Sequence, residues 1–472
     1  MLLLLSVLAL VLPAPAAAQM RLTPEQAAAI AARTLDAERV EVTPRPAERL
    51  WDVSDEHQLV VVDDRTGAVL ETWTGPQVGW PMARGYPGAF GGAVNAPWIW
   101  GVLAVLFAAP FLRGPPRLVH LDVAVLLAFS LGYAAFNGPH LKLSATLSTL
   151  ALAYLLARAL QLARRGPPDH APWTPPLTLL VFLLGFRALL ALTGGNVIDV
   201  GYAGVIGADR LTHGEPLYGH FPADNAHGDT YGPVAYAAYV PFELAFPWSG
   251  TWDELPAARA AAVAFDLACV ALCWLLGRRL NAGRLLAYLW AAYPFTLLAM
   301  ASAANDALVA ALILAALALA ARPAARGAVL ALAGLTKFAP LALAPLLATY
   351  RRGTLVTVAA AVGTAALILA PFELDRLWER TLGFQAGRSS PFSLWGSYGW
   401  AEPLQPVAVA ATVILAVAVA FVPRRRDLHT LCALAAAVLI ALQLALGYWF
   451  YLYLVWFVAP LWAALSAPSQ RD

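Results

Sequence analysis

Residues 194–233, with the sequence GGNVIDVGYAGVIGADRLTHGEPLYGHFPADNAHGDTYGP, form a long polar stretch between two strongly apolar parts of the chain. Only 13% of all residues are charged, so ionisable side chains are unusually dense in this stretch. They include Asp199, Asp209, Arg210, His213, Glu215, Asp224, His227 and Asp229. We expect the chemistry of the protein to lie here.

The composition of the chain is that of a membrane protein. Of its 472 residues, 60% are hydrophobic, and the mean hydropathy is +0.65. Several apolar runs approach the roughly 20 residues that a helix needs to cross a bilayer. A net charge of +2 gives no support for nucleic-acid binding. We therefore predict an all-α polytopic membrane protein with about eleven transmembrane helices, one re-entrant hairpin and a small N-terminal α+β domain.

The N-terminal part predicts an exported domain. Residues 1–19 have an apolar core followed by small residues, which indicates a signal peptide or, because a basic start is missing, an uncleaved anchor. In residues 20–80, Thr23 and Gln26 form a capping-box signature before a helix. Three short strands follow, with a turn at 64–67, and we interpret Asp63 and Asp64 as turn formers. The segment VVVDDRTGAVLETW (60–73) resembles the PepSY-like fold, which implies a binding or regulatory appendage.

The Lys/Arg bias of the short loops predicts the topology beyond the linker 81–96. Residues 97–176 hold three extra spans, and residues 177–472 the main membrane domain. The predicted spans are 97–112, 118–136, 143–163, 177–193, 257–276, 285–301, 306–321, 354–371, 404–422, 430–446 and 449–465. This order places the polar stretch and the N-terminal domain on the extracytoplasmic side. We interpret 231–247 as an interfacial or re-entrant helix.

Residues 327–349 carry basic residues at both ends, which a single crossing does not satisfy. We predict a broken hairpin there, with Gly334, Pro340 and Pro345 as the breaking residues, because irregular backbone at membrane depth is tolerated where it lines a protein cavity.

Several motifs resemble the GT-C glycosyltransferases. Asp199, Tyr202, GEPLY (214–218) and YGP (231–233) are similar to the first outer loop of glycosyltransferase family 87, the polyprenol-phosphate-mannose-dependent mannosyltransferases. AANDALV (303–309), GLTKFAPLALAPLL (334–347), GRSSPFSLWG (387–396) and YWFYLYLVWF (448–457) extend the resemblance over about 177–465. It implies a polyprenyl-phosphate sugar donor, with mannose suggested and pentoses open, an acceptor in the cell-envelope lipids or glycans, and a multi-pass protein of the cell membrane.

The resemblance also implies a general base in the first outer loop, and the residue types agree. Displacing a lipid phosphate from a sugar carbon needs a base near the incoming hydroxyl and cations near the leaving phosphate. We predict Asp199 as the base of an inverting transfer, Lys337 and Arg388 as phosphate ligands, and Arg210 as a reserve. The predicted substrate-binding residues are Tyr202, Tyr218, Tyr231, Asn305, Asp306 and Trp395.

Each of these residues has a second interpretation. Asp199 is otherwise a helix cap, Lys337 a lysine that snorkels to lipid headgroups, and Arg388 a solvated arginine. Asn305 and Asp306 cap the span at 306–321 or bind the donor or a metal.

Other polar residues also have more than one interpretation. We interpret His213, His220 and His227 as surface residues rather than as metal ligands, so no cofactor is assigned, although a divalent cation stays open. Arg187 and Asp266 lie in predicted spans and either pair or face a cavity. Cys269, Cys273 and Cys432 fit small buried hydrophobes.

Two other classes of function compete with the transferase. A transporter or flippase of a lipid-linked sugar would also need broken helices and buried charge, but it should have polar groups on both sides of a midplane cavity. A sensor with a passive membrane anchor does not need about eleven spans. We therefore predict an integral membrane glycosyltransferase.

Overall fold

The computed structural model describes residues 20–35, 39–46, 48–55, 57–80, 90–168, 172–422 and 427–466. The chain divides into two compact units, one of Met1–Tyr86 with Asn137–Pro139 and one of the remaining residues. The predicted signal or anchor segment 1–19 and residues 81–89 of the predicted linker lie outside the described residues.

The N-terminal unit is a helix on an antiparallel sheet. Helix α2 (Pro24–Ala31) begins with the predicted capping box, since Thr23 and Gln26 exchange hydrogen bonds. The strands lie in the order β1-β2-β3-β4 and are followed by the short helix α3 (Pro76–Gly79). Their bounds are Glu41–Arg45, Leu50–Ser54, Gln58–Asp63 and Val69–Thr74. Strand β1 was not predicted from the sequence, because Pro44 lies within it and its exposed positions do not alternate regularly.

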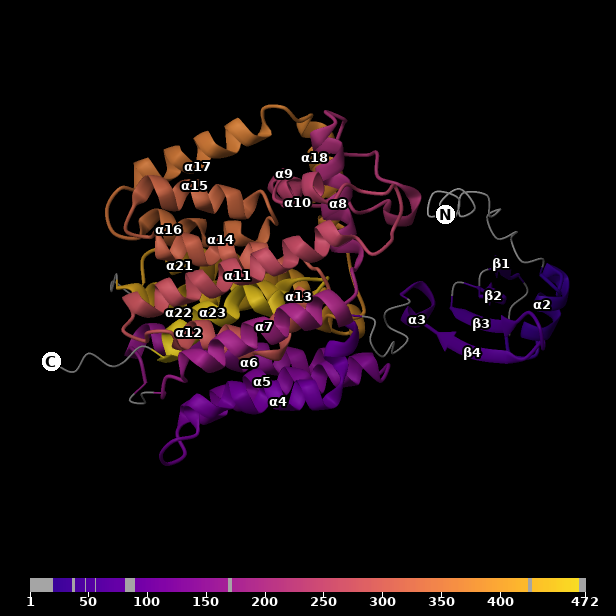
Figure 1. Cartoon of the computed structure of the whole chain (residues 1–472), viewed down its shortest axis with the longest axis horizontal. Coiled ribbons are helices and arrows are strands. Elements are labelled where there is room, and N and C mark those ends of the chain that lie inside the picture. Colours follow the sequence, from indigo (N-terminus) through magenta and orange to yellow (C-terminus); the bar gives the residue numbers. More distant parts are fainter. Residues whose placement is uncertain are drawn as a thin grey trace, which may run out of the picture. The chain divides into compact units, whose positions relative to one another are not determined.

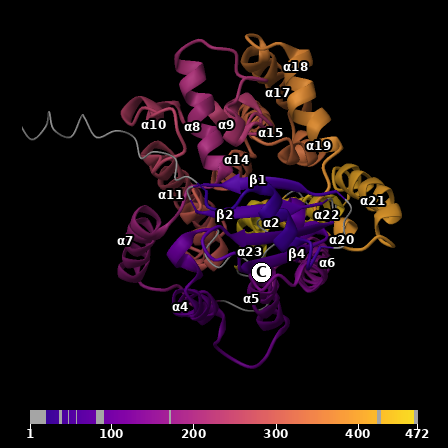
Figure 2. The ribbon, with the colours of Figure 1, turned by 90° about the vertical axis from the view of Figure 1, so that its right-hand side faces the viewer.

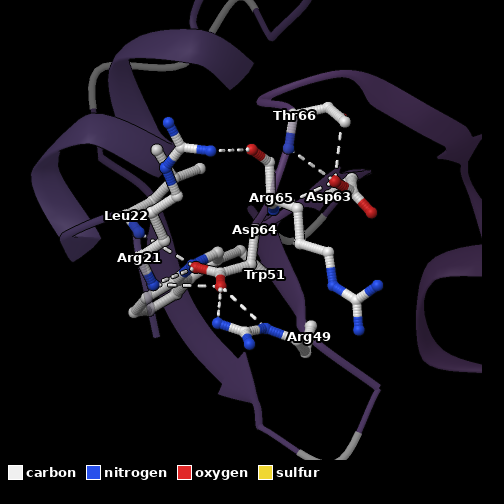
Figure 3. Close-up of polar contacts among 8 residues, drawn as sticks. All are labelled: Arg21, Leu22, Arg49, Trp51, Asp63, Asp64, Arg65 and Thr66. Atoms are coloured by element: carbon white, nitrogen blue, oxygen red, sulfur yellow. Dashed lines mark hydrogen bonds and ion pairs between the residues drawn. The ribbon is translucent and has the colours of Figure 1, made fainter. Parts of the chain in front are cut away.

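Asp63 and Asp64 differ in role, although they are neighbours (Figure 3). The Asp63 carboxylate accepts hydrogen bonds from the backbone of Arg65 and Thr66 and so forms the predicted turn. Asp64 is fully buried and does not serve mainly as a turn former, which corrects the prediction. It accepts hydrogen bonds from the N–H groups of Arg21 and Leu22, from Trp51 Nε1 and from Arg49. Burial alone would raise the pKa of Asp64, but these donors lower it to about 2.

The second unit is a bundle of helices that run roughly parallel in Figure 1. Its first half contains η3 (Gly92–Asn95), α4 (Pro97–Ala108), η4 (Ala109–Phe111), α5 (Leu118–Asn137), α6 (Leu141–Arg165), α7 (Leu177–Gly194), α8 (Asp199–Thr212), η5 (Ala223–Asn225), α9 (Pro233–Ala237), α10 (Val240–Ala245), α11 (Pro256–Arg279), α12 (Leu285–Ala292) and α13 (Pro294–Ala301).

Its second half contains α14 (Asp306–Ala318), α15 (Pro323–Gly334), η6 (Ala339–Leu343), α16 (Ala344–Thr349), α17 (Thr354–Leu369), α18 (Leu374–Trp378), the π-helical turn η7 (Glu379–Gly383), α19 (Phe384–Ala386), α20 (Leu394–Ser397), η8 (Glu402–Leu404), α21 (Gln405–Ala418), α22 (Leu428–Ala445), η9 (Tyr451–Leu454) and α23 (Val455–Ser466). In Figure 2, α22 and α23 lie in the middle of the bundle, with α4, α7 and α17 at its periphery.

Five helices in the described part are long and apolar enough to cross a membrane: α5, α6, α7, α11 and α22. A sixth results if α17 and the segment 374–386, bent by 106° against each other, count as one span. The chain is therefore compatible with a multi-pass membrane protein, while the predicted count of about eleven is not confirmed. Several predicted spans are shorter or broken, as at 285–301, where Pro294 separates α12 from α13.

Arg187 and Asp266 pair with each other inside the bundle, which settles the choice that the sequence left open. The Arg187 Nη2 atom of α7 lies 2.5 Å from Asp266 Oδ1 of α11, and both side chains are buried. Asp266 also accepts a hydrogen bond from Trp290 Nε1 at 2.8 Å. Arg187 Nη1 donates to Ala291 O at 3.1 Å, whereas Arg187 Nε has no hydrogen-bond partner among the described residues. Buried charge is tolerated when it is paired in this way.

Candidate functional site

Helix α15 is interrupted after Gly334, and the end of the polar stretch 194–233 packs against this break, next to Lys337. Helix α15 ends at Gly334, and η6 begins only at Ala339. The last carbonyls of a helix lack partners within it; here the N–H groups of Gly232 and Val234 donate to Thr336 O and Leu335 O at 3.2 and 3.1 Å. Any side chain at Gly232 would collide with the Leu335 carbonyl. The end of the loop is thus fixed against the break, with Tyr231 beside Lys337.

Lys337 lies in a cage of aromatic rings. Its Nζ atom is 5.2, 5.4 and 5.5 Å from the ring centroids of Tyr231, Tyr453 and Trp456. It also pairs with Asp306 Oδ1 at 2.7 Å. Only 9% of the residue is exposed. Lys337 is therefore held inside the protein, by charge and by cation–π contact, rather than extended toward a surface.

Asp306 and Asn305 lie behind this cage, at the start of α14. Asp306 Oδ1 accepts a second hydrogen bond, from Trp456 Nε1 at 2.9 Å. Asn305 occupies the N-cap position, but its side chain makes no capping hydrogen bond. Within the described residues, Asp306 Oδ2 and Asn305 Oδ1 are buried without a hydrogen-bond partner. Asp306 thus binds Lys337 and Trp456 directly. Neither Asn305 nor Asp306 is among the residues that line the neighbouring cavity.

Arg388 is a second cation, and it lines the same cavity as Lys337. Its guanidinium stacks on the Tyr448 ring at 3.7 Å from the centroid, with Phe384 at 5.6 Å. The loop that follows it is anchored, since Ser390 N and Ser393 Oγ donate to Gly447 O at 3.0 and 2.8 Å. Among the described residues no carboxylate pairs with Arg388. The rings of Tyr448 and Phe384 therefore hold the Arg388 guanidinium in place, and its N–H groups can still donate hydrogen bonds to a ligand.

These residues surround a cavity of about 350 Å³. One part of its wall is charged and aromatic, and another is apolar, with Phe338, Leu382 and Leu442. The lining residues are Thr230, Tyr231, Lys337, Phe338, Ala339, Ala342, Leu382, Gln385, Arg388, Leu442, Leu446, Gly447, Tyr448, Tyr453 and Trp456. The wall thus comes from four distant parts of the chain.

Asp199 is the first residue of α8 and is not among the residues that line this cavity. It is close enough for the charges of Arg388, Lys337 and Asp306 to act on it. Its side chain is accessible to solvent, but the surrounding protein removes much of its hydration. This burial raises the pKa of Asp199 above its ordinary value; the backbone N–H of Val200 and the two cations lower it, and Asp306 raises it further. The predicted base thus lies within electrostatic range of both predicted phosphate ligands.

A contact between the polar stretch 194–233 and η7 was not predicted from the sequence. Asp229 is fully buried, and both its oxygens accept hydrogen bonds from Arg380 of η7 at 2.7 Å. Arg380 also donates to Ala226 O, and Gly219 N donates to Asp229 at 2.6 Å. No local pattern marks Arg380, because its partner is distant in the sequence.

The remaining predicted residues lie outside the cavity. Arg210 is at the far end of α8, about 16 Å along the helix from Asp199, and binds Pro216 O and Glu215. Tyr202 is buried and donates to Asp224. Tyr218 is buried and donates to Tyr231 O. Trp395 donates to Leu444 O and lines a separate small crevice. These four side chains support the loops and do not face the cavity.

The three loop histidines do not gather. His213, His220 and His227 are exposed, and His227 stacks on Phe384. In the described part of the chain, no group of three or more His, Cys, Asp or Glu residues could hold a metal ion. The three cysteines are buried and unpaired.

Comparisons with known proteins add no relative. No protein-family model matches the chain, and neither curated proteins nor solved structures gave a significant match.

Proposed function

We propose that this protein is an integral membrane glycosyltransferase that moves a sugar, mannose in the first instance, from a polyprenyl phosphate to an acceptor of the cell envelope. The observation that carries the proposal is the placement of Asp199 within electrostatic range of Lys337 and Arg388, which both line one cavity. A base near two cations is what a displacement of phosphate from a sugar carbon requires.

The two kinds of wall match the two parts of such a donor. The phosphate and the sugar are polar, and aromatic rings such as those of Tyr231 and Tyr448 offer surfaces for the sugar. The first isoprene units are apolar and suit the wall of Phe338, Leu382 and Leu442.

The charges favour a donor with a single negative charge. Asp306 already balances Lys337 at 2.7 Å, whereas Arg388 has no carboxylate partner among the described residues. One unbalanced guanidinium complements the single charge of a phosphodiester. We therefore assign the direct phosphate contact to Arg388, which can bind two phosphate oxygens at once. Lys337 contributes positive potential from its cage.

The transfer then takes one displacement. An acceptor hydroxyl placed between Asp199 and the cavity gives its proton to the Asp199 carboxylate, and its oxygen forms a bond to the anomeric carbon. The bond from that carbon to the phosphate oxygen breaks, and the lipid phosphate keeps the electron pair beside Arg388. Attack opposite to the leaving group inverts the anomeric centre.

The test uses purified full-length protein, radiolabelled polyprenyl-phosphate-mannose and a cell-envelope lipid extract. We expect sugar transfer by the wild type and by Arg210→Ala, and loss of transfer by Asp199→Asn. Full transfer by Asp199→Asn would exclude Asp199 as the base. Donor binding and movement across vesicle membranes without transfer would favour the flippase instead. A topology reporter at Gly195 tests the proposed extracytoplasmic side of the site and of the N-terminal domain.

A further inference from the structure

The start of α15 and the start of α17 lie together, at the end of the bundle away from α8 and α18 (Figure 1). The two helices pack closely: any side chain at Gly327 of α15 would collide with the Thr357 carbonyl of α17. A Cβ atom at Gly353 would come within 2.5 Å of Pro323. Neither helix has a side-chain cap at its N-terminus. Two sets of free N–H groups and two positive dipole ends therefore meet in one place.

Arginines add to this positive potential. An open hollow of about 600 Å³ between the two helix starts is lined by Ala321, Pro323, Arg351, Arg352 and Gly353. Arg351 and Arg352 are exposed. Within the described residues neither arginine makes an ion pair. The nearby carboxylate of Asp427, which acts on Tyr350, is engaged in capping α22.

A buried arginine fixes the shape of the hollow. Arg326 is fully buried and donates to Thr357 Oγ1 and Ala320 O at 2.9 and 2.8 Å, and to Arg352 O at 3.2 Å. All its partners among the described residues are neutral oxygens. Its charge is therefore not cancelled by a carboxylate, and the same contacts hold the 350–353 turn in place.

We propose that this hollow binds the phosphate headgroup of an anionic phospholipid. Helix N-termini and arginines both favour phosphate oxygens. The first residues of α17 argue for a lipid as the source of the phosphate. Leu355 is 84% exposed, and Val356, Val358 and Val362 continue an exposed apolar face along the same helix. Acyl chains can lie on that face while the headgroup occupies the hollow, as in other basic pockets at helix ends in membranes.

The experiment compares matched pairs of arginines in the full-length protein. Arg351→Ala/Arg352→Ala removes two exposed charges from the hollow. The control, Arg164→Ala/Arg165→Ala, removes two exposed charges from the end of α6, outside the hollow. Delipidated protein in a neutral detergent is titrated with fluorescent phosphatidylglycerol, phosphatidylcholine or inorganic phosphate, and each variant is first checked for an unchanged size and melting temperature.

We expect wild type and the control to bind phosphatidylglycerol about tenfold or more tightly than phosphatidylcholine, and the hollow variant to lose that preference. If both double variants lose the preference for phosphatidylglycerol equally, the preference comes from basic residues in general and not from this hollow, which would overturn the proposal. Binding of inorganic phosphate as tight as that of phosphatidylglycerol would show a phosphate site without a lipid contribution and would overturn the lipid assignment. Sugar transfer plays no part in this readout, so its result is independent of the proposed function.

Discussion

Arg380 binds both carboxylate oxygens of Asp229, 151 positions earlier in the chain, through two hydrogen bonds of 2.7 Å. Asp229 lies two residues before Tyr231, and Arg380 lies eight residues before Arg388. One ion pair thus fixes the spacing between the part of the site that carries Tyr231 and the part that carries the unbalanced guanidinium.

Breaking this pair should destabilise the protein. Arg380→Gln leaves a buried carboxylate without its main partner, and we expect a loss of about 2–3 kcal/mol, somewhat below the range for a fully buried pair because Arg380 is partly exposed. Asp229→Asn/Arg380→Gln should lose less than the sum of the single changes. Unfolding in mixed detergent micelles across the double-mutant cycle measures this coupling. Strict additivity would show that the pair contributes nothing.

Ionisation of Asp199 should determine how sugar transfer depends on pH in the acidic range. Burial raises its pKa above the ordinary 3.8, and a base acts only when ionised. Transfer should therefore rise with pH through a value above 3.8 and level off once Asp199 is ionised. The check is the pH dependence of kcat/KM for wild type and Asp199→Glu. If Asp199→Glu is active and its kcat/KM rises with pH over the same range as in wild type, the ionising group is not Asp199.

The same shift predicts an opposite effect on stability. A carboxyl whose pKa is raised in the folded state binds its proton more tightly there, so its ionised form destabilises the fold at neutral pH. Asp199→Asn should therefore raise the melting temperature at pH 7 while it removes transfer. At a pH below the ordinary pKa the difference from wild type should vanish. A lower melting temperature at neutral pH would argue against a desolvated carboxylate.

Arg388 and Arg210 should behave differently. Arg388→Ala should raise the donor KM by about tenfold or more, because a bidentate contact to phosphate is lost. Arg388→Lys should raise the donor KM less than Arg388→Ala does, but still above that of wild type, since lysine acts as a point charge. Arg210→Ala should leave the donor KM nearly unchanged. Steady-state kinetics with varied donor decide the matter, and equal effects at both positions would contradict the assignment of the phosphate to Arg388.

The Tyr451 hydroxyl joins the early helices to the cavity wall. It lies 2.7 Å from Ser144 Oγ and 2.9 Å from Ser148 Oγ of α6. A Cβ atom at Gly132 of α5 would come within 2.6 Å of it. Gly132→Ala should therefore cost about 1–3 kcal/mol of stability and disturb Tyr453, two residues further on.

The rescue follows from the same geometry. Tyr451→Phe alone should cost about 1 kcal/mol, because the two serines lose their partner. In the Gly132→Ala background, however, it removes the colliding oxygen and should restore part of the stability. Melting temperatures of the four proteins measure this, and a double variant less stable than Gly132→Ala would show that the collision is not with the hydroxyl.

The N-terminal unit should be sensitive to acid through Asp64. Its pKa of about 2 in the folded state lies below the ordinary value of 3.8, so its contribution to stability is present above the ordinary pKa and is lost as the pH falls toward 2. Pepsin should cleave the unit progressively faster over this interval. Asp64→Asn should be cleaved rapidly throughout, and cleavage independent of pH in wild type would refute the role of Asp64.

The sequence predicted the main features of the fold because they have local causes. The capping box at Thr23 and the turn after Asp63 depend on neighbouring residues, and hydropathy alone indicates helices such as α6 and α11. Charge bias in the loops predicted that Asp199, Lys337 and Arg388 lie on one side, and in the structure the charges of Lys337 and Arg388 act on Asp199. Their roles stay predictions.

The missed features depend on contacts between distant residues. Nothing near Lys337 in the sequence indicates that Asp306 balances its charge, and nothing near Arg380 indicates Asp229. Trp395 was predicted at the sugar site because it lies in an outer loop, but the direction of its side chain, toward Leu444 O, is set by packing alone. Hydropathy likewise did not reveal the break at Pro294.

The origin of the cavity wall in four separate segments bears on how the protein is made. Tyr231, Lys337, Arg388 and Trp456 leave the ribosome in that order. The aromatic cage of Lys337 and the second donor to Asp306 are therefore completed only after η9 and the start of α23 have been made. Asp306 and Tyr231 precede Lys337 in the chain, whereas Tyr453 and Trp456 follow it, so a chain that stops short of η9 contains both members of the ion pair but only one of the three rings.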